Sequence, residues 1–303
     1  MKQQSIGYYL ALAEEADRKL NGAEQGAWLS RLEAEREHLL AALTTSTESG
    51  GDDVTTLRLC GALLSFWRMR GYIAEGRQWC EAVLKLAGAQ EATAERAKVL
   101  NGAGTMARMQ GDFGVAQTYH EESLTIHNAL GDKKGSAASL NGLGNLASSQ
   151  GDYATARQCY ERSLALKREL GDKAVIAGSL NNLGYLAYLQ GDTPSARRYY
   201  VESLNLRREA GQLSLQETLT LLQGLAEVAT ADNQQERGAC LYGAIKGLCE
   251  RPEGKMLTLD EKAFSADIAT LRDALGEVEF AAAFAQGTVM TLEQAIEYAL
   301  VSQ

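Results

Sequence analysis

The chain has 303 residues, of which 45% are hydrophobic and 23% charged, a composition typical of globular proteins. Its formal net charge is −9 and no stripe of basic residues stands out, which disfavours binding to the phosphate backbone of nucleic acids. Only two residues are prolines, so helix breakers are scarce and an all-helical fold is expected. No apolar run is long enough to cross a membrane, and five cysteines without a CxxC pair are typical of a reducing cytoplasm.

Residues 1–50 are expected to form an N-terminal helical pair. Apolar residues recur at helical spacing over 4–20 and over 24–43, which predicts one amphipathic helix in each range. The polar stretch TTSTESGGDD, residues 44–53, is rich in turn-forming residues and is expected to be a loop. This loop would separate the helical pair from the region that follows.

A sequence repeat with a period of 40 residues follows the loop. The stretch LNGAGTMARMQGD at 100–112 returns as LNGLGNLASSQGD at 140–152 and as LNNLGYLAYLQGD at 180–192. Because such self-similarity is the signature of stacked structural units, a solenoid is expected over residues 51–232. Columns of like residues share the period: Gly71, Gly111, Gly151 and Gly191; Asp112, Asp152 and Asp192; Gly104, Gly144, Gly184 and Gly224; Ala116, Ala156 and Ala196.

Each unit is expected to contain two helices. In the clearest unit, Asp172 is predicted to cap a helix that runs to about Leu189, and Gly191 suits the left-handed residue after its end. Asp192 is then predicted to cap a second helix, which runs to about Ala210. The Gly-Asp pair would therefore mark the helix ends throughout the repeat region.

A longer motif extends this pattern. It reads L-x-x-L-G-x-L-A, then G-D, then an alanine, an aromatic residue and S-L, and it is clearest over 180–204. This motif resembles the tetratricopeptide repeat (TPR) in a 40-residue form. The resemblance covers about residues 52–230. It implies an all-α fold, a right-handed TPR superhelix with helical caps at both ends, in which the first helix of each unit lines a concave groove.

The C-terminal extension, residues 233–303, is expected to be helical over 234–248, 260–276 and 291–300, with a loop at ERPEGKMLT. Together with the N-terminal segment it resembles the C-terminal TPR sensor region of bacterial MalT-like, LuxR-type or winged-helix STAND ATPase transcriptional regulators. That resemblance implies a signal-sensing module that works with an ATPase and a DNA-binding domain of the same regulator. Since no G-x-x-x-x-G-K-[ST] motif and no basic helix-turn-helix occur, we expect the chain to be the sensor part alone.

One polar position recurs in the predicted first helices, where Asn101, Asn141 and Asn181 follow a leucine. Asn145 lies four residues after Asn141 and therefore on the same helix face. An amide both donates and accepts hydrogen bonds, so it can hold a peptide unit in both directions. First helices about 10 Å apart would match about three residues of extended chain, so these asparagines would grip every third peptide unit. The groove of kinesin light chain resembles this arrangement.

Side-chain selectivity in such a groove is expected from Arg108, Tyr185 and Tyr188, which neighbour the asparagines. A second interpretation is structural. The asparagines would then tie adjacent repeats together, because buried amides need hydrogen-bond partners, and the two tyrosines would pack between repeats. The sequence leaves both interpretations open.

Catalytic and metal-binding chemistry is not indicated. The three histidines lack metal-ligand spacing, His120 falls in a core column with Tyr160 and Tyr200, and no G-x-S-x-G motif occurs. We therefore expect a cytoplasmic, non-catalytic module without cofactor or metal, which binds a peptide or protein segment and has no direct nucleic-acid or membrane partner. The alternatives are a small-molecule effector sensor and a scaffold or oligomerisation module.

Overall fold

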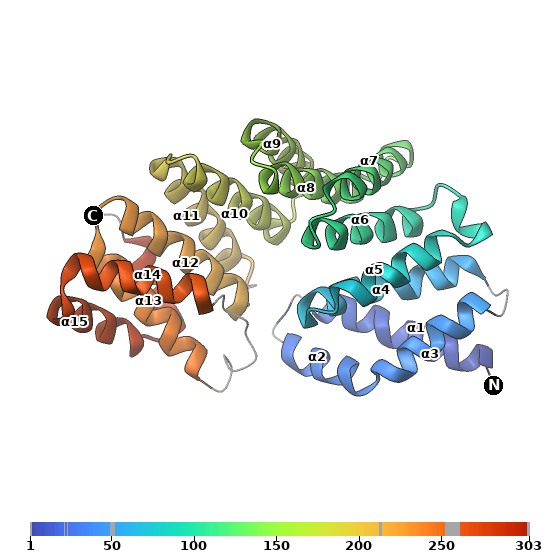
Figure 1. The fold of residues 1–303 in the computed structure, drawn as a ribbon, viewed down its shortest axis with the longest axis horizontal. Coiled ribbons are helices and arrows are strands. Elements are labelled where there is room, and N and C mark those ends of the chain that lie inside the picture. Colours follow the sequence, from blue (N-terminus) through green and yellow to red (C-terminus); the bar gives the residue numbers. More distant parts are fainter. Residues whose placement is uncertain are drawn as a thin grey trace. The chain divides into compact units, whose positions relative to one another are not determined.

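The computed structural model describes residues 2–20, 22, 24–48, 52–211, 214–251 and 261–301. Across these residues the regular structure is helical and no β-strand occurs, so the expected all-α fold is confirmed (Figure 1). The chain divides into two compact units, residues 1–171 and 172–303, and each is considered by itself. The expected borders of the repeat region at residues 51 and 232 stay a prediction.

Unit 1 begins with a group of three helices and continues with helix pairs joined by short turns. The pairs are α4 with α5, α6 with α7, and α8 with α9 (Figure 1). The described helices are α1 (Lys2–Lys19), α2 (Gln25–Ala34), α3 (Arg36–Glu48), α4 (Asp53–Arg70), α5 (Ile73–Leu84), a short 3-10 helix η1 (Ala87–Gln90), α6 (Ala94–Met109), α7 (Phe113–Ala129), α8 (Lys133–Ser149) and α9 (Tyr153–Leu170).

The N-terminal segment differs from the expectation in two ways. The single helix predicted over 24–43 is two helices, which are interrupted at Glu35. The loop predicted over 44–53 is wrong for residues 44–48, because α3 continues through Glu48, while residues 49–51 lie outside the described residues. The hydroxyls of Thr44 and Thr45 donate to the carbonyls of Leu40 and Ala41 within the helix, which satisfies polar groups that the sequence interpretation assigned to a turn.

The Gly-Asp turns form as predicted. Gly111, Gly151 and Gly191 have φ angles of 81°, 78° and 75°, a left-handed conformation that suits glycine after a helix end. Each following aspartate caps the next helix, and Asp152 shows the pattern, since its side chain accepts from the backbone amide of Thr155 at 3.0 Å. Sequence-local chemistry therefore sets where these helices start and stop.

Within each pair, small residues let the two helices approach closely. A Cβ atom placed on Gly144 of α8 would lie 2.5 Å from Cε1 of Tyr160 on α9. A buried serine of the second helix adds a hydrogen bond to a carbonyl of the first helix. Ser163 donates to Ala137 at 2.8 Å, and Ser123 makes the same bond to Ala97 at 2.7 Å. Large rings thus fill the space that the glycines leave open.

Unit 2 contains two more such pairs, α10 with α11 and α12 with α13, and a C-terminal helical group (Figure 1). The described helices are α10 (Lys173–Leu189), α11 (Thr193–Glu209), α12 (Leu215–Ala231), α13 (Gln235–Glu250), α14 (Glu261–Leu275), α15 (Glu277–Thr288) and α16 (Leu292–Leu300). The predicted helices over 234–248, 260–276 and 291–300 correspond to α13, α14 and α16. The loop predicted at ERPEGKMLT lies largely outside the described residues.

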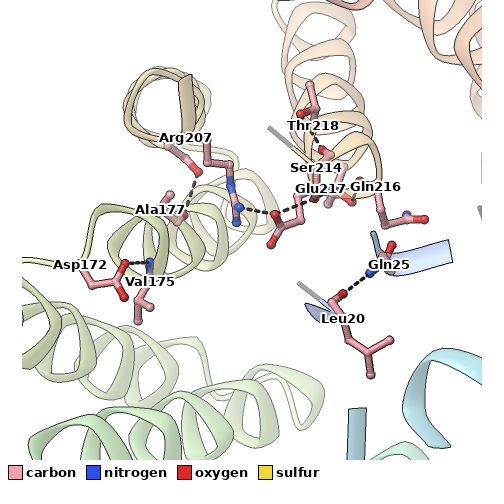
Figure 2. A network of polar contacts seen from close by, with 12 residues as sticks. Leu20, Gln25, Asp172, Val175, Ala177, Arg207, Ser214, Gln216, Glu217 and Thr218 are labelled. Atoms are coloured by element: carbon pink, nitrogen blue, oxygen red, sulfur yellow. Dashed lines mark hydrogen bonds and ion pairs between the residues drawn. The ribbon is translucent and has the colours of Figure 1, made fainter. Parts of the chain in front are cut away.

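Two polar arrangements hold unit 2 together. Figure 2 shows buried Arg207 of α11 paired with Glu217 of α12, whose carboxylate also accepts from the Ser214 hydroxyl at 2.7 Å. Arg237 of α13 donates to the backbone carbonyls at the end of α16, including that of Val301 at 2.8 Å. Each arginine therefore ties one helix to the end of another.

Helix α15 was not expected from the sequence. It packs against α13 at very short range, since a Cβ atom on Gly287 would lie 1.9 Å from the carbonyl oxygen of Cys240. Much of its surface is exposed, including Val278, whose exposed fraction is 82%. An alanine-rich helix that packs through its backbone has a weak apolar stripe, so helical periodicity in the sequence does not indicate it.

Candidate functional site

The three asparagines predicted to line a groove occupy equivalent places in first helices. Asn101 lies on α6 and Asn141 on α8, both in unit 1, and Asn181 lies on α10 in unit 2. All three side chains are partly buried. One helical turn further on, the same face carries Thr105, Asn145 or Tyr185, so the expected helix face does form in each repeat.

Asn101 is hydrogen-bonded within its own repeat. Its Oδ1 lies 2.7 Å from Nδ1 of His120, which is fully buried on α7. Burial, followed by the nearby Arg108, lowers the pKa of His120 to about 4, so the ring is neutral near pH 7. Nδ1–H therefore donates to the amide oxygen, and the amide nitrogen of Asn101 keeps its donors for other partners.

Asn145 makes the corresponding contact in the second repeat. The hydroxyl of Tyr160 on α9 donates to Oδ1 of Asn145 on α8 at 2.7 Å. Both observed bonds join the two helices of one repeat, whereas the structural interpretation from sequence placed them between adjacent repeats. These two amides thus have a structural function, and their NH2 groups remain as donors.

The predicted selectivity residues lie in different surroundings. Arg108 of α6 is partly buried, its Nη1 donates to the Ser149 hydroxyl on α8 at 3.2 Å, and burial lowers its pKa. Tyr185 is exposed on α10. Tyr188 packs against the hydrophobic core of unit 2, and burial, followed by the charge of Glu227, raises its pKa.

Helix α12 carries the same polar face, but its register is shifted. Ser214 accepts from the amide of Glu217 as Asp172 accepts from that of Val175, and Asn233, with φ of 60°, takes the place of Gly191 (Figure 2). Both ends of α12 therefore lie two residues later than the 40-residue period predicts.

This shift corrects one column of the repeat. Gly224 is not the counterpart of Gly184. It corresponds to Gly142, and each of these two glycines packs on the ring of the preceding second helix, Tyr200 and His120 respectively. The segment LQGLAEVA at 222–229 therefore matches LNNLGYLA at 180–187, with its leucine, valine and alanine positions equally buried.

Two residues of the polar face were missed for this reason. In the corrected register, Gln223 is the counterpart of Asn181, and Glu227 is the counterpart of Tyr185. Asn101, Asn141, Asn181 and Gln223 thus form one column of amides, here called the amide ladder. Aligning the repeats with a shift of two residues at α12 identifies Gln223 as the fourth member of the amide ladder.

A pocket of about 200 Å³ opens between α10 and α12 in unit 2. Oδ1 of Asn181 is buried there without a hydrogen-bond partner among the described residues, while Nε2 of Gln223 donates to Oε1 of Glu227 at 3.1 Å. Burial and then the charge of Asp267 raise the pKa of Glu227 to about 7, against the opposing hydrogen bond from Gln223. This space, here called the α10–α12 pocket, is lined by Asn181, Asn182, Tyr185, Tyr200, Thr220, Gln223, Gly224 and Glu227.

Comparisons with known proteins agree with this architecture. Two family models, each described as a tetratricopeptide repeat, match residues 95–169 and 176–210. These segments are tetratricopeptide repeats. The TPR helix pairs are α6 with α7, α8 with α9, and α10 with α11, the three units that carry the asparagines.

Two solved structures are similar to this chain in fold. The crystal structure of NprR in complex with its cognate peptide NprX is 16% identical, with a TM-score of 0.61, and the match covers 97% of this chain and 85% of that one. The crystal structure of BtubC (BKLC) from P. vanneervenii is 15% identical, with a TM-score of 0.51, over 91% of this chain and 93% of that one. No curated protein sequence matches significantly.

Unit 1 has a larger cavity, of about 470 Å³, that the sequence did not indicate. Its wall comes from α1, α4, α6 and α8 and includes Asn101. Several of its charges are paired, since Arg58 contacts Glu14 at 2.7 Å and Lys98 contacts Asp17 at 2.7 Å. The lining therefore combines apolar side chains with charged groups of both signs.

Among the residues that the structure describes, no group of three or more His, Cys, Asp or Glu side chains is placed to hold a metal ion. None of the described helices is long and apolar enough to span a bilayer.

Proposed function

We propose that the chain is a non-catalytic recognition module that binds a peptide or protein segment along the first helices of its repeats. The observation that carries this proposal is the amide ladder. In each unit, two first helices that contact each other present an amide at the same position: Asn101 and Asn141 in unit 1, Asn181 and Gln223 in unit 2. Repeated amides suit the repeated donors and acceptors of a peptide backbone, whatever its side chains.

The likeness to NprR supports the proposal by analogy. That structure holds a cognate peptide on a related helical fold. At 16% identity the likeness concerns the fold alone. The residues proposed to contact a peptide therefore follow from the side chains of this protein and not from those of NprR.

We further propose that the module is the signal-sensing part of a bacterial ATPase-type transcriptional regulator and acts in the cytoplasm. The support is the sequence resemblance of both chain ends to such regulators. In that setting, a bound segment would bias the equilibrium between two states of the regulator by binding one of them more tightly.

A small-molecule effector is the second candidate, and the cavity of unit 1 favours it. Its volume of about 470 Å³ falls in the range of small-ligand sites, and its lining mixes apolar residues with a few polar groups such as Asn101. A ligand recovered with the purified chain that proves not to be a peptide would support this candidate.

The test of peptide binding is a display selection with a random dodecapeptide library. It would be run on the wild-type chain, on the Asn141→Ala/Asn181→Ala variant and on a control, Asn205→Ala, whose asparagine lies on the second helix α11. Asn101 is left intact because it holds His120. We expect the wild type and the control to select peptides and the ladder variant to bind them at least about tenfold more weakly.

Melting curves of all three chains establish that the ladder variant is folded. If the folded ladder variant binds the selected peptides as tightly as the wild type does, the ladder is not the binding surface. If the wild type selects no peptide at all, the proposed function is wrong.

A further inference from the structure

The α10–α12 pocket differs from the equivalent places in the earlier repeats. In the first repeat the oxygen of Asn101 is paired with His120, and in the second the oxygen of Asn145 is paired with Tyr160. In the third repeat the oxygen of Asn181 has no partner within the part of the chain that the structure describes, and Tyr185 stands where the second repeat has Asn145. The ring of Tyr200 therefore lies in the pocket without the amide acceptor that Tyr160 has.

The pocket also holds a carboxylate without a cation. Glu227 accepts a hydrogen bond from Gln223, yet neither Glu227 nor Asp267 forms an ion pair with a lysine or arginine within the described residues. The other titratable groups that interact with Glu227 are tyrosines of three neighbouring helices: Tyr188 of α10, Tyr200 of α11 and Tyr242 of α13. Tyr242 donates to Asp267 of α14 at 2.7 Å.

We propose that the α10–α12 pocket receives the basic side chain, lysine or arginine, of a peptide that lies along α10 and α12. This inference rests on the proposed peptide-binding function and names the residue type that one of its positions would require.

The chemistry of the lining favours a cationic side chain over an anionic or a neutral one. The amide oxygen of Asn181 can accept a hydrogen bond, and no described residue donates one to it. Glu227 has a second carboxylate oxygen, to which Gln223 does not donate. An ammonium or guanidinium group has donors only, so it satisfies both. The exposed ring of Tyr185 at the rim and the ring of Tyr200 add aromatic faces, which attract cations. An acidic side chain would instead meet the carboxyl group of Glu227 and the unpaired oxygen of Asn181.

The pH dependence of binding follows from the carboxylate. A bound cation favours the charged form of Glu227 and lowers its pKa from about 7. Affinity for a basic side chain should therefore rise as the pH increases through about 7 and fall in mildly acidic buffer. Asp267 and the three tyrosines do not reverse this sign, because none of these side chains can carry a positive charge.

Two measurements test the inference. The first is carbon-13 NMR of the side-chain carboxyl of Glu227, assigned with Glu227→Gln and titrated with Nα-acetyl-lysine N-methylamide. The norleucine analogue, which lacks the charge, is the control ligand. We expect the lysine compound to lower the pKa of Glu227 and the norleucine compound to leave it unchanged.

The second measurement repeats the dodecapeptide selection on the wild type, on Glu227→Gln and on Glu293→Gln. The third chain is a matched control, because it removes an exposed carboxylate of α16 that does not line the pocket. Peptides selected by the wild type and the control should carry lysine or arginine at one fixed position. They should bind Glu227→Gln about tenfold more weakly.

The outcomes separate this inference from the proposed function. Selected peptides without a fixed basic position would overturn the inference and leave peptide binding intact. If no peptide is selected, the proposed function fails and the inference fails with it. The inference would also be overturned if the lysine and norleucine compounds change the pKa of Glu227 equally, or if neither changes it. This measurement is made on the wild-type chain, and Glu227→Gln is used only to assign the signal.

Discussion

The fold places the carboxyl group of Glu227 where its charged form is unfavourable. Burial and the charge of Asp267 raise its pKa from an ordinary value of 4.5 to about 7, although Gln223 donates a hydrogen bond to it. The folded chain therefore holds a proton between these two pH values, whereas the unfolded chain has released it. By linkage, the free energy of unfolding falls as the pH rises through this window, and the full cost is present above about pH 7.

Replacement of Glu227 by glutamine should remove this cost. We expect Glu227→Gln to be as stable as the wild type at about pH 4 and more stable by about 3 kcal/mol at about pH 8. Urea denaturation at both pH values measures the difference. The exposed Glu293→Gln variant serves as the control and should show little difference at either pH. A stability gain for Glu227→Gln that is the same at both pH values would contradict the linkage argument.

At the scale of a helix pair, α10 provides a matched comparison between two glycines. A Cβ atom on Gly184 would lie 2.8 Å from the ring of Tyr200, whereas a Cβ atom on Gly178 would meet nothing within 4 Å. Both glycines are in the interior of the same helix, so the intrinsic preference of helices for alanine applies equally to both. The packing around them is what differs.

We therefore expect opposite signs for the two alanine substitutions. Gly184→Ala should destabilise the chain by about 1–3 kcal/mol, because the ring of Tyr200 must shift in a packed interior. Gly178→Ala should stabilise it by about 0.5–1 kcal/mol through helix propensity and chain entropy. Denaturant unfolding followed by circular dichroism measures both. A gain in stability for Gly184→Ala would show that Tyr200 is not tightly packed against α10.

Helix ends in the repeats could be predicted because their determinants are local. Gly151 and Asp152 end one helix and cap the next through contacts with residues that are near in sequence. Helix α15 instead depends on packing between segments. Gly287 lies against the backbone of α13, a contact that no periodicity of its own sequence reveals.

The candidate site was predictable only in part for the same reason. The asparagines stand out because they recur at a fixed spacing. Gln223 and Glu227 were missed because α12 starts two residues late, and a strict 40-residue period therefore aligned Gly224 with Gly184. The pairing of Asn101 with His120 and of Asn145 with Tyr160 depends on the second helix of each repeat, which the ladder pattern does not include.

At the scale of the whole molecule, stability should follow the rule for stacked repeats. Within each compact unit the helix pairs contact their neighbours along the chain, so the stability of a unit should be a sum of local terms and of interfaces between neighbours. The chain divides into two compact units, residues 1–171 and 172–303, and this rule applies to each of them. A packing defect in one block should then weaken that block more than the other.

Hydrogen exchange measured by mass spectrometry can test this with two equivalent substitutions. Gly144→Ala places a methyl group against Tyr160 in unit 1, and Gly184→Ala places one against Tyr200 in unit 2. We expect the first variant to speed exchange mainly in α6 to α9 and the second mainly in α10 to α13, because each defect acts on neighbouring helices first. Gly178→Ala, which meets no neighbouring atom, should not speed exchange in either unit. If each variant instead speeds exchange equally in both units, the chain unfolds as one cooperative block. A signal that loosens one end of the chain would then be felt throughout, whereas separate responses would confine its effect to the unit that binds the ligand.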